Sequence, residues 1–140
     1  MGNEQPLKFA GDGPQMARLG VGVQTHILIV DDSSDDRNMY AHYLAQKGYR
    51  VSKAHDGKDG LEKALGLEPD VVLLDLWLPR ISGWEVMQRM KADARTTRIP
   101  VLVITGHTAM QPRGCAGWLT KPCLLDELGG EVARILEARG

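Results

Sequence analysis

The chain has 140 residues and a formal net charge of −1, with 17 Lys and Arg against 18 Asp and Glu, and 43% of its residues are hydrophobic. This length suits a single globular domain with its own core, and the charge balance excludes bulk binding to nucleic acid, which needs a clear basic excess. No apolar stretch reaches the roughly 18 residues of a membrane span, and the two cysteines lack zinc-ligand spacing, so we expect a cytoplasmic protein without a disulfide framework.

The N-terminal segment 1–24 is rich in glycine and has no periodicity that would give a helix or strand an apolar face. It also lacks the basic start and the continuous apolar centre of a secretory signal. We therefore expect residues 1–24 to form a flexible tail and residues 25–139 to form one folded domain.

Beyond the tail, short apolar runs alternate with longer segments of helical periodicity. Strands are predicted at His26–Val30, Arg50–Lys53, Asp70–Asp75, Pro100–Thr105 and Trp118–Thr120. Helices are predicted from a cap at Ser34 to a stop at Gly48, over Lys58–Leu65, over Ser82–Asp93 and along the apolar stripe from Leu124 to Leu136.

Two of these strands, Asp70–Asp75 and Pro100–Thr105, are apolar on both faces, as expected for central strands that helices cover on each side. Strands that alternate with helices indicate an α/β fold with a doubly wound parallel sheet. Ligands of such sheets bind just beyond the carboxyl ends of the strands, so the residues at those ends are the first candidates for a site.

Polar side chains follow four of the predicted strands: Asp31 and Asp32, Asp75, Thr105 and Lys121. Crowded carboxylates repel one another and need a counter-charge, and hard oxygen ligands suit Mg²⁺. Asp75 could then attack phosphorus to form an aspartyl phosphate. Mg²⁺ and Lys121 would offset charge on the phosphoryl oxygens, and Thr105 could donate a hydrogen bond to one of them.

Each of these residues taken alone has a simpler explanation. An Asp pair before a helix is more often a cap than a metal site, and a single lysine after a strand is more often solvated. The combination favours a site. The chain contains no GxGxxG or GxxxxGK[ST] motif, which disfavours a nucleotide cofactor.

Four motifs together resemble the receiver domain of two-component response regulators: ILIVDD at 27–32, LLDLWLPRISG at 73–83, VLVIT at 101–105 and LTKP at 119–122. The resemblance extends over residues 24–139 in the same order and approximate spacing. It implies a flavodoxin-like fold, in which five parallel strands have the order 2-1-3-4-5.

The resemblance also implies roles for particular residues. Asp75 matches the phosphoacceptor, and Asp31, Asp32, Asp75 and the main-chain carbonyl of Trp77 match the Mg²⁺ site, with Asp32 as the direct ligand and Asp31 acting mainly through water. Lys121 matches the family's lysine, and Pro122 follows it where the family has a cis-capable bond.

Further matches concern switching and the lifetime of the phosphoryl group. Thr105 matches the switch hydroxyl and Trp118 stands in place of the rotating aromatic, which is usually Tyr or Phe. Trp77 and His107 match the positions that tune access of water. We expect the indole of Trp77 to slow hydrolysis, although His107 could instead orient the attacking water.

The sequence departs from the family between Thr105 and Gly114, where it has only the eight residues GHTAMQPR. The family fits a helix of about three turns there. We expect this fourth helix to be shortened or missing, with at most one turn over Met110–Arg113, because proline and glycine disfavour helix. Dimerisation through the surface that this helix helps to form is therefore not expected.

The resemblance implies a phosphoacceptor that takes a phosphoryl group from a histidine kinase or phosphotransfer protein. The sequence ends after the last helix, so we expect a stand-alone regulator that signals by contact with a downstream protein. It would catalyse its own phosphorylation and slow dephosphorylation, without being a turnover enzyme.

Two other function classes stay open. One is a binding module that works without phosphorylation. The other is a Mg²⁺-dependent phosphohydrolase that uses Asp75 as nucleophile, but such enzymes need an acid/base carboxylate two residues on, where this chain has Trp77.

Overall fold

The computed structural model describes residues 24–106 and 113–139. The predicted tail, apart from Gln24, lies outside the described residues, and so does His107. None of the helices in the described ranges has the length and apolar character needed to cross a lipid bilayer.

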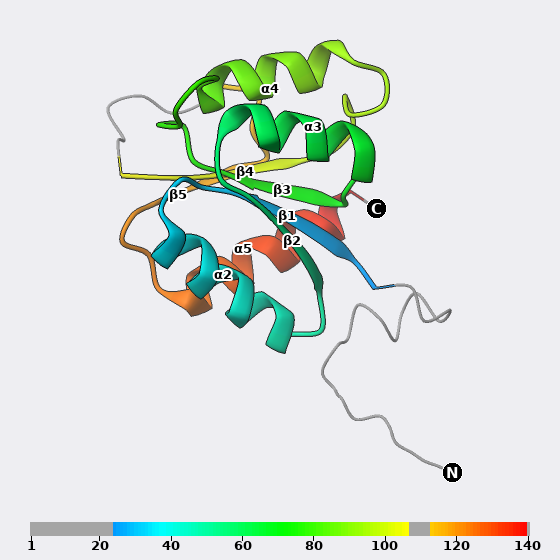
Figure 1. Ribbon diagram of the computed structural model, residues 1–140. Helices are drawn as coiled ribbons and strands as arrows, with labels where there is room; N and C mark the ends of the chain where they lie inside the picture. The colour runs from blue at the N-terminus through cyan, green and yellow to red at the C-terminus, as the bar shows by residue number, and fades with distance from the viewer. Residues whose placement is uncertain (1–23, 107–112, 140) are drawn as a thin grey trace.

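The described residues form a five-stranded sheet with the order β2-β1-β3-β4-β5, in which all neighbouring strands are parallel (Figure 1). The strands are β1 (His26–Val30), β2 (Arg50–Ala54), β3 (Val71–Leu74), β4 (Val101–Thr105) and β5 (Gly117–Thr120). The helices are α2 (Ser34–Gln46), α3 (Gly57–Leu67), α4 (Gly83–Ala92) and α5 (Leu125–Ala138). The predicted doubly wound sheet and its strand order are confirmed.

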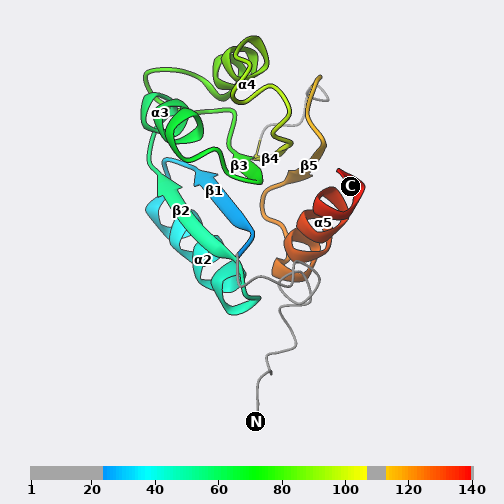
Figure 2. The same ribbon diagram turned by 90° about the vertical axis from the view of Figure 1, so that its right-hand side faces the viewer.

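Helices cover both faces of the sheet. Figures 1 and 2 show α2 and α5 on one face and α3 and α4 on the other. Successive residues of a strand point to opposite faces, so β1 sends Ile27 and Ile29 into the core beside α2 and α5, and Leu28 and Val30 into the core beside α3 and α4. This two-sided burial explains why the central strands are apolar throughout.

The predicted elements agree with the observed ones to within one or two residues at most ends, but one cap is wrong. Ser33, not Ser34, caps α2: its side chain accepts a hydrogen bond from the backbone N–H of Asp36, and Ser34 is the first helical residue. Gly48 follows the helix with φ of 99°, the left-handed conformation that glycine adopts without strain.

Helix α3 packs unusually close to β1. A Cβ atom built on Gly60 would lie 2.6 Å from Cγ1 of Val30, so a larger residue would push the helix away from the sheet. At Gly66, near the C-terminal end of the same helix, an added Cβ atom would have open space around it. Glycine is therefore required at one of these helical sites and not at the other.

Between β4 and β5, the described residues 106 and 113–116 contain no helix, so the described part of the chain has four helices. Most of the turn predicted at Met110–Arg113 falls on residues that the structure does not describe. Within the described residues, Trp118 and Thr120 of the edge strand β5 are exposed, Trp118 to 38%.

At the amino ends of the strands, the carboxylate of Asp70 contacts both the start of β1 and the residue after α5. The side chain of Asp70 accepts a hydrogen bond from the backbone N–H of His26 at 2.7 Å and one from Nη1 of Arg139 at 2.9 Å. The first residue of β1 and the residue after α5 are thus held by the same side chain.

Candidate functional site

Three carboxylates meet at the carboxyl edge of the sheet. One oxygen each of Asp31, Asp32 and Asp75 lies within 4.8 Å of the other two. The pairing of Val30 with Leu74 places the ends of β1 and β3 side by side, and the backbone N–H of Asp75 donates to the carbonyl of Val30 at 3.0 Å. The predicted convergence of these three residues is confirmed.

This cluster fits a hard divalent cation by its donor chemistry. All three side chains offer carboxylate oxygen, the ligand type that Mg²⁺ prefers. Asp31 and Asp75 are 2% and 8% exposed, whereas Asp32 is exposed. The set therefore combines buried ligands with an opening to solvent, as a site that also admits water and phosphate requires.

Lys121 brings the counter-charge to the same edge. Its Nζ lies 2.8 Å from Oδ2 of Asp31, 2.8 Å from Oδ2 of Asp36 and 3.2 Å from Oδ2 of Asp75. Its backbone N–H donates to the carbonyl of Thr105 at 2.9 Å, which fixes the start of the β5–α5 loop against the end of β4. The peptide bond between Lys121 and Pro122 is cis.

The pKa values of Lys121 and Asp31 are both raised, but for different reasons. Burial alone disfavours the charged form of Lys121, but its hydrogen bonds to Asp31 and Asp36 and the charges of Asp31 and Asp75 outweigh burial and raise the pKa of Lys121. For Asp31, burial raises the pKa more than the hydrogen bonds from Lys121 and Ser33 lower it. One ammonium shared among three carboxylates leaves the buried Asp31 incompletely compensated.

Short local hydrogen bonds orient the two buried carboxylates. Oδ1 of Asp31 accepts from the backbone N–H of Ser33 at 2.9 Å, and Oδ1 of Asp75 accepts from the backbone N–H of Trp77 at 3.1 Å. In both residues Oδ2 is the oxygen that faces Lys121. The backbone after each strand thus holds one oxygen while the ammonium holds the other.

The loop between β3 and α4 is anchored against α3. Arg80 has φ of 72°, and its Nε lies 3.0 Å from Oδ2 of Asp56, which caps α3. A Cβ atom on Gly57 would lie 1.7 Å from the carbonyl oxygen of Ile81, so only glycine allows this approach. The loop carries Trp77, which is 58% exposed and whose backbone N–H donates to Asp75.

Thr105 and Trp118 lie on neighbouring strands and face the same side of the sheet. Thr105 ends β4 and is 1% exposed, and Trp118 of β5 pairs with Val103, two residues before Thr105. Paired residues of a parallel sheet point to the same face. The switch roles of Thr105 and Trp118 stay predictions, and His107 lies outside the described residues.

Asp36 is the site residue that the sequence reasoning missed. The pattern placed it only in the first turn of a helix, yet its carboxylate contacts Lys121 as closely as that of Asp31 does. A helical spacing of four puts Asp36 on the same face as Tyr40, which is 2% exposed. That spacing is the signal that could have directed Asp36 toward the site.

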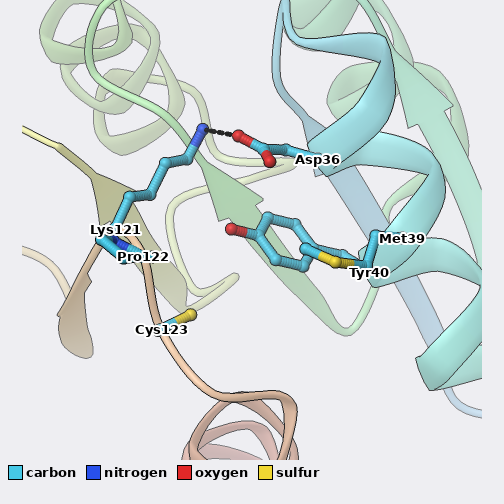
Figure 3. A pocket seen from close by; sticks show the side chains of 6 residues that line it. All are labelled: Asp36, Met39, Tyr40, Lys121, Pro122 and Cys123. Carbon is cyan, nitrogen blue, oxygen red and sulfur yellow. Dashed lines mark hydrogen bonds and ion pairs between the residues drawn. The ribbon is translucent and has the colours of Figure 1, made fainter.

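A cavity of about 290 Å³ opens next to this contact. It lies between α2 and the β5–α5 loop and is lined by Asp36, Met39, Tyr40, Lys121, Pro122 and Cys123. Figure 3 shows Lys121 reaching from one wall to Asp36 on the other, with the ring of Tyr40 below the ion pair. Burial raises the pKa of the Cys123 thiol, so this cysteine stays protonated at neutral pH.

Comparison with known proteins gives consistent matches. A family model described as the response regulator receiver domain matches residues 27–133. Over 116 residues the chain is 37% identical to the DNA-binding dual master transcriptional regulator RpaA of Synechocystis sp., covering 79% of this chain and 48% of that protein. It is 35% identical over 102 residues to the protein PilH of Pseudomonas aeruginosa, covering 69% of this chain and 84% of PilH. The chain thus spans about half the length of RpaA and most of PilH.

Solved structures agree with this match. The chemotaxis protein CheY4 of Vibrio cholerae superposes with a TM-score of 0.76 at 30% identity, covering 81% of this chain and 99% of CheY4. The receiver domain of the sensor histidine kinase PA1611 of Pseudomonas aeruginosa superposes with a TM-score of 0.77 at 25% identity, covering 82% of this chain and 99% of that domain. That structure is described with a magnesium ion coordinated in its active-site cleft.

Proposed function

Because this chain belongs to the response regulator receiver family, we propose that it accepts a phosphoryl group on Asp75 and signals through contact with another protein. The observation that carries the proposal is the convergence of Asp31, Asp32, Asp75 and Lys121 on one edge of the sheet. The donor would be a phosphohistidine of a histidine kinase or phosphotransfer protein in the cytoplasm, and the downstream partner is a protein rather than nucleic acid.

In the transfer step, one carboxylate oxygen of Asp75 forms a bond to phosphorus as the bond from phosphorus to the donor imidazole nitrogen breaks. The nitrogen keeps the electron pair and takes up a proton from solvent. The hydrogen bond from Trp77 N–H to Oδ1 and the contact of Lys121 with Oδ2 orient the Asp75 carboxylate before the attack.

The carboxylates of Asp31, Asp32 and Asp75 and the main-chain carbonyl of Trp77 would hold Mg²⁺. When bound, Mg²⁺ supplies charge neutralisation at the phosphoryl oxygens. Lys121 adds a second positive charge, and the buried Thr105 at the end of β4 would donate a hydrogen bond to a phosphoryl oxygen.

Receiver domains are signalling modules rather than turnover enzymes, so the output of this reaction is a change in binding surface. We assign the switch to Thr105 and Trp118, which face the same side of the sheet. The exposed indole of Trp77 would shield the phosphoryl group and slow its hydrolysis, with His107 as a second tuning position.

The test is intact mass spectrometry after incubation with acetyl phosphate and Mg²⁺. We expect one phosphoryl adduct on the wild type and on Asp35→Asn, whose carboxylate is exposed on the first turn of α2. We expect none on Asp75→Ala and none when a chelator replaces Mg²⁺. An adduct on Asp75→Ala would refute the assignment of the acceptor, and a wild type that forms no adduct would favour a binding module that works without phosphorylation.

A further inference from the structure

The ammonium of Lys121 has a full set of partners before any phosphoryl group arrives. An ammonium carries three N–H donors, and three carboxylates lie within reach of Nζ: Asp31 and Asp36 at 2.8 Å and Asp75 at 3.2 Å. A phosphoryl oxygen that binds Lys121 must therefore displace one of these carboxylates.

The three partners are not equivalent. Asp31 and Asp75 belong to the carboxylate group that could hold a metal ion, and both are buried. Asp36 is outside that group and stands on α2, across the cavity from the β5–α5 loop (Figure 3). Its contact with the site is the ion pair with Lys121.

Local structure holds Asp36 in contact with Lys121. Its backbone N–H donates to the capping side chain of Ser33, which fixes the first turn of α2. Its side chain is 33% exposed, against 3% for Asp31, so its charge pays a smaller desolvation cost. The contact between Asp36 and the Lys121 ammonium therefore does not depend on a metal ion.

We propose that Asp36 competes with the phosphoryl group on Asp75 for Lys121, and so limits how tightly the site holds a phosphoryl group. The inference rests on the proposed function. Two effects act in the same direction, because the Asp36 carboxylate occupies one of the three N–H donors and also adds negative charge beside an anionic group. Asp36 is a positioning residue, since it contacts Lys121 rather than the reacting atoms.

Beryllofluoride, a stable mimic of the phosphoryl group, measures this competition directly. Its affinity is determined by calorimetry at saturating Mg²⁺, so that a change in Mg²⁺ affinity does not enter the result. Asp36→Ala is expected to bind beryllofluoride about three- to tenfold more tightly than the wild type. Asp36→Asn is expected to fall between them, because an amide oxygen still accepts from Lys121 but carries no charge.

Asp35→Asn is the matched control. It removes the same charge from the same first turn of α2, but its side chain is exposed to solvent. Its affinity for beryllofluoride is expected to equal that of the wild type. Thermal unfolding of each variant verifies that it is folded, and Asp36→Asn keeps the shape of the side chain if Asp36→Ala does not fold.

The outcomes separate the two proposals. A wild type that does not bind beryllofluoride with Mg²⁺ overturns the proposed function itself. A wild type that binds, together with Asp36 variants that bind equally or more weakly, overturns the competition while leaving the function intact. Equal tightening in the Asp35 and Asp36 variants also overturns it, because the effect would then be general charge rather than contact with Lys121.

Discussion

Asp31→Asn is expected to stabilise the folded domain when no Mg²⁺ is present. The substitution preserves the shape of the side chain and leaves one oxygen, which can accept from Ser33 N–H, while Lys121 keeps Asp36 and Asp75 as acceptors. It removes the charge from a side chain that is only 3% exposed and that lies beside two other carboxylates. Burial is also the main reason that the pKa of Asp31 is raised.

The magnitude follows from the distances. Two carboxylates 4.8 Å apart repel by about 3.5 kcal/mol at an effective dielectric constant of about 20, and Asp31 has two such neighbours. The attraction to Lys121 at 2.8 Å is about 6 kcal/mol on the same scale, so attraction and repulsion nearly cancel. The cost of burying the charge then remains. We expect Asp31→Asn to gain about 1–2 kcal/mol, or about 4–8 °C in Tm.

The assay is thermal unfolding in chelator and in excess Mg²⁺. Mg²⁺ should raise the Tm of the wild type, because it binds the folded state, and should raise that of Asp31→Asn much less. The two Tm values should therefore converge as Mg²⁺ is added. A lower Tm for Asp31→Asn in chelator would refute the reasoning, since it would mean that the contact with Lys121 outweighs burial and repulsion.

The same variant gives a pH test. A carboxyl whose pKa is raised in the folded protein binds its proton more tightly there, so the wild type loses stability as pH rises from 3.8 through the raised value. Asp31→Asn lacks this loss. Its advantage over the wild type should therefore be present at neutral pH and should vanish as pH falls toward 3.8.

Two further predictions concern packing and the lysine. Gly60→Ala should destabilise the domain by about 1–3 kcal/mol in urea unfolding, because the new methyl group meets Val30, whereas Gly66→Ala on the same helix should stabilise it by about 0.5–1 kcal/mol; equal effects would contradict the close approach of α3 to β1. The raised pKa of Lys121 contributes stability that is fully present below pH 10.5 and is lost above it, so urea midpoints between pH 10 and 11.5 should fall more steeply for the wild type than for Lys121→Met.

The strands of the core were predictable because buried strands consist of apolar residues, which the sequence shows directly. β3 and β4 are apolar on both faces since helices cover both, and a short two-faced apolar run is typical of such strands. The edge strand β2 gave a weaker pattern, because four of its five residues are partly or fully exposed.

The polar edge was predictable only where a residue directly follows a strand. Asp31, Asp75 and Lys121 meet because the ends of parallel strands meet, and that rule needs no coordinates. Asp36 and the contact of Arg80 with Asp56 depend on how helices and loops turn after the strands, which no local pattern specifies. The wrong prediction of Ser34 as the cap, in place of Ser33, has a similar cause, since two adjacent serines stand at the start of the helix and the sequence does not show which one caps it.

The carboxylate of Asp70 has a practical consequence for engineering. Because it binds both His26 and Arg139, the two ends of the folded unit lie within one side chain of each other, at the amino edge of the sheet. A short linker could join residues 26 and 139, and new chain ends could be opened at the turn around Gly48. Such a circular permutant would keep all five strands in register and leave the acidic edge at the opposite end of the strands untouched, so a reporter domain could be inserted away from the proposed phosphoacceptor.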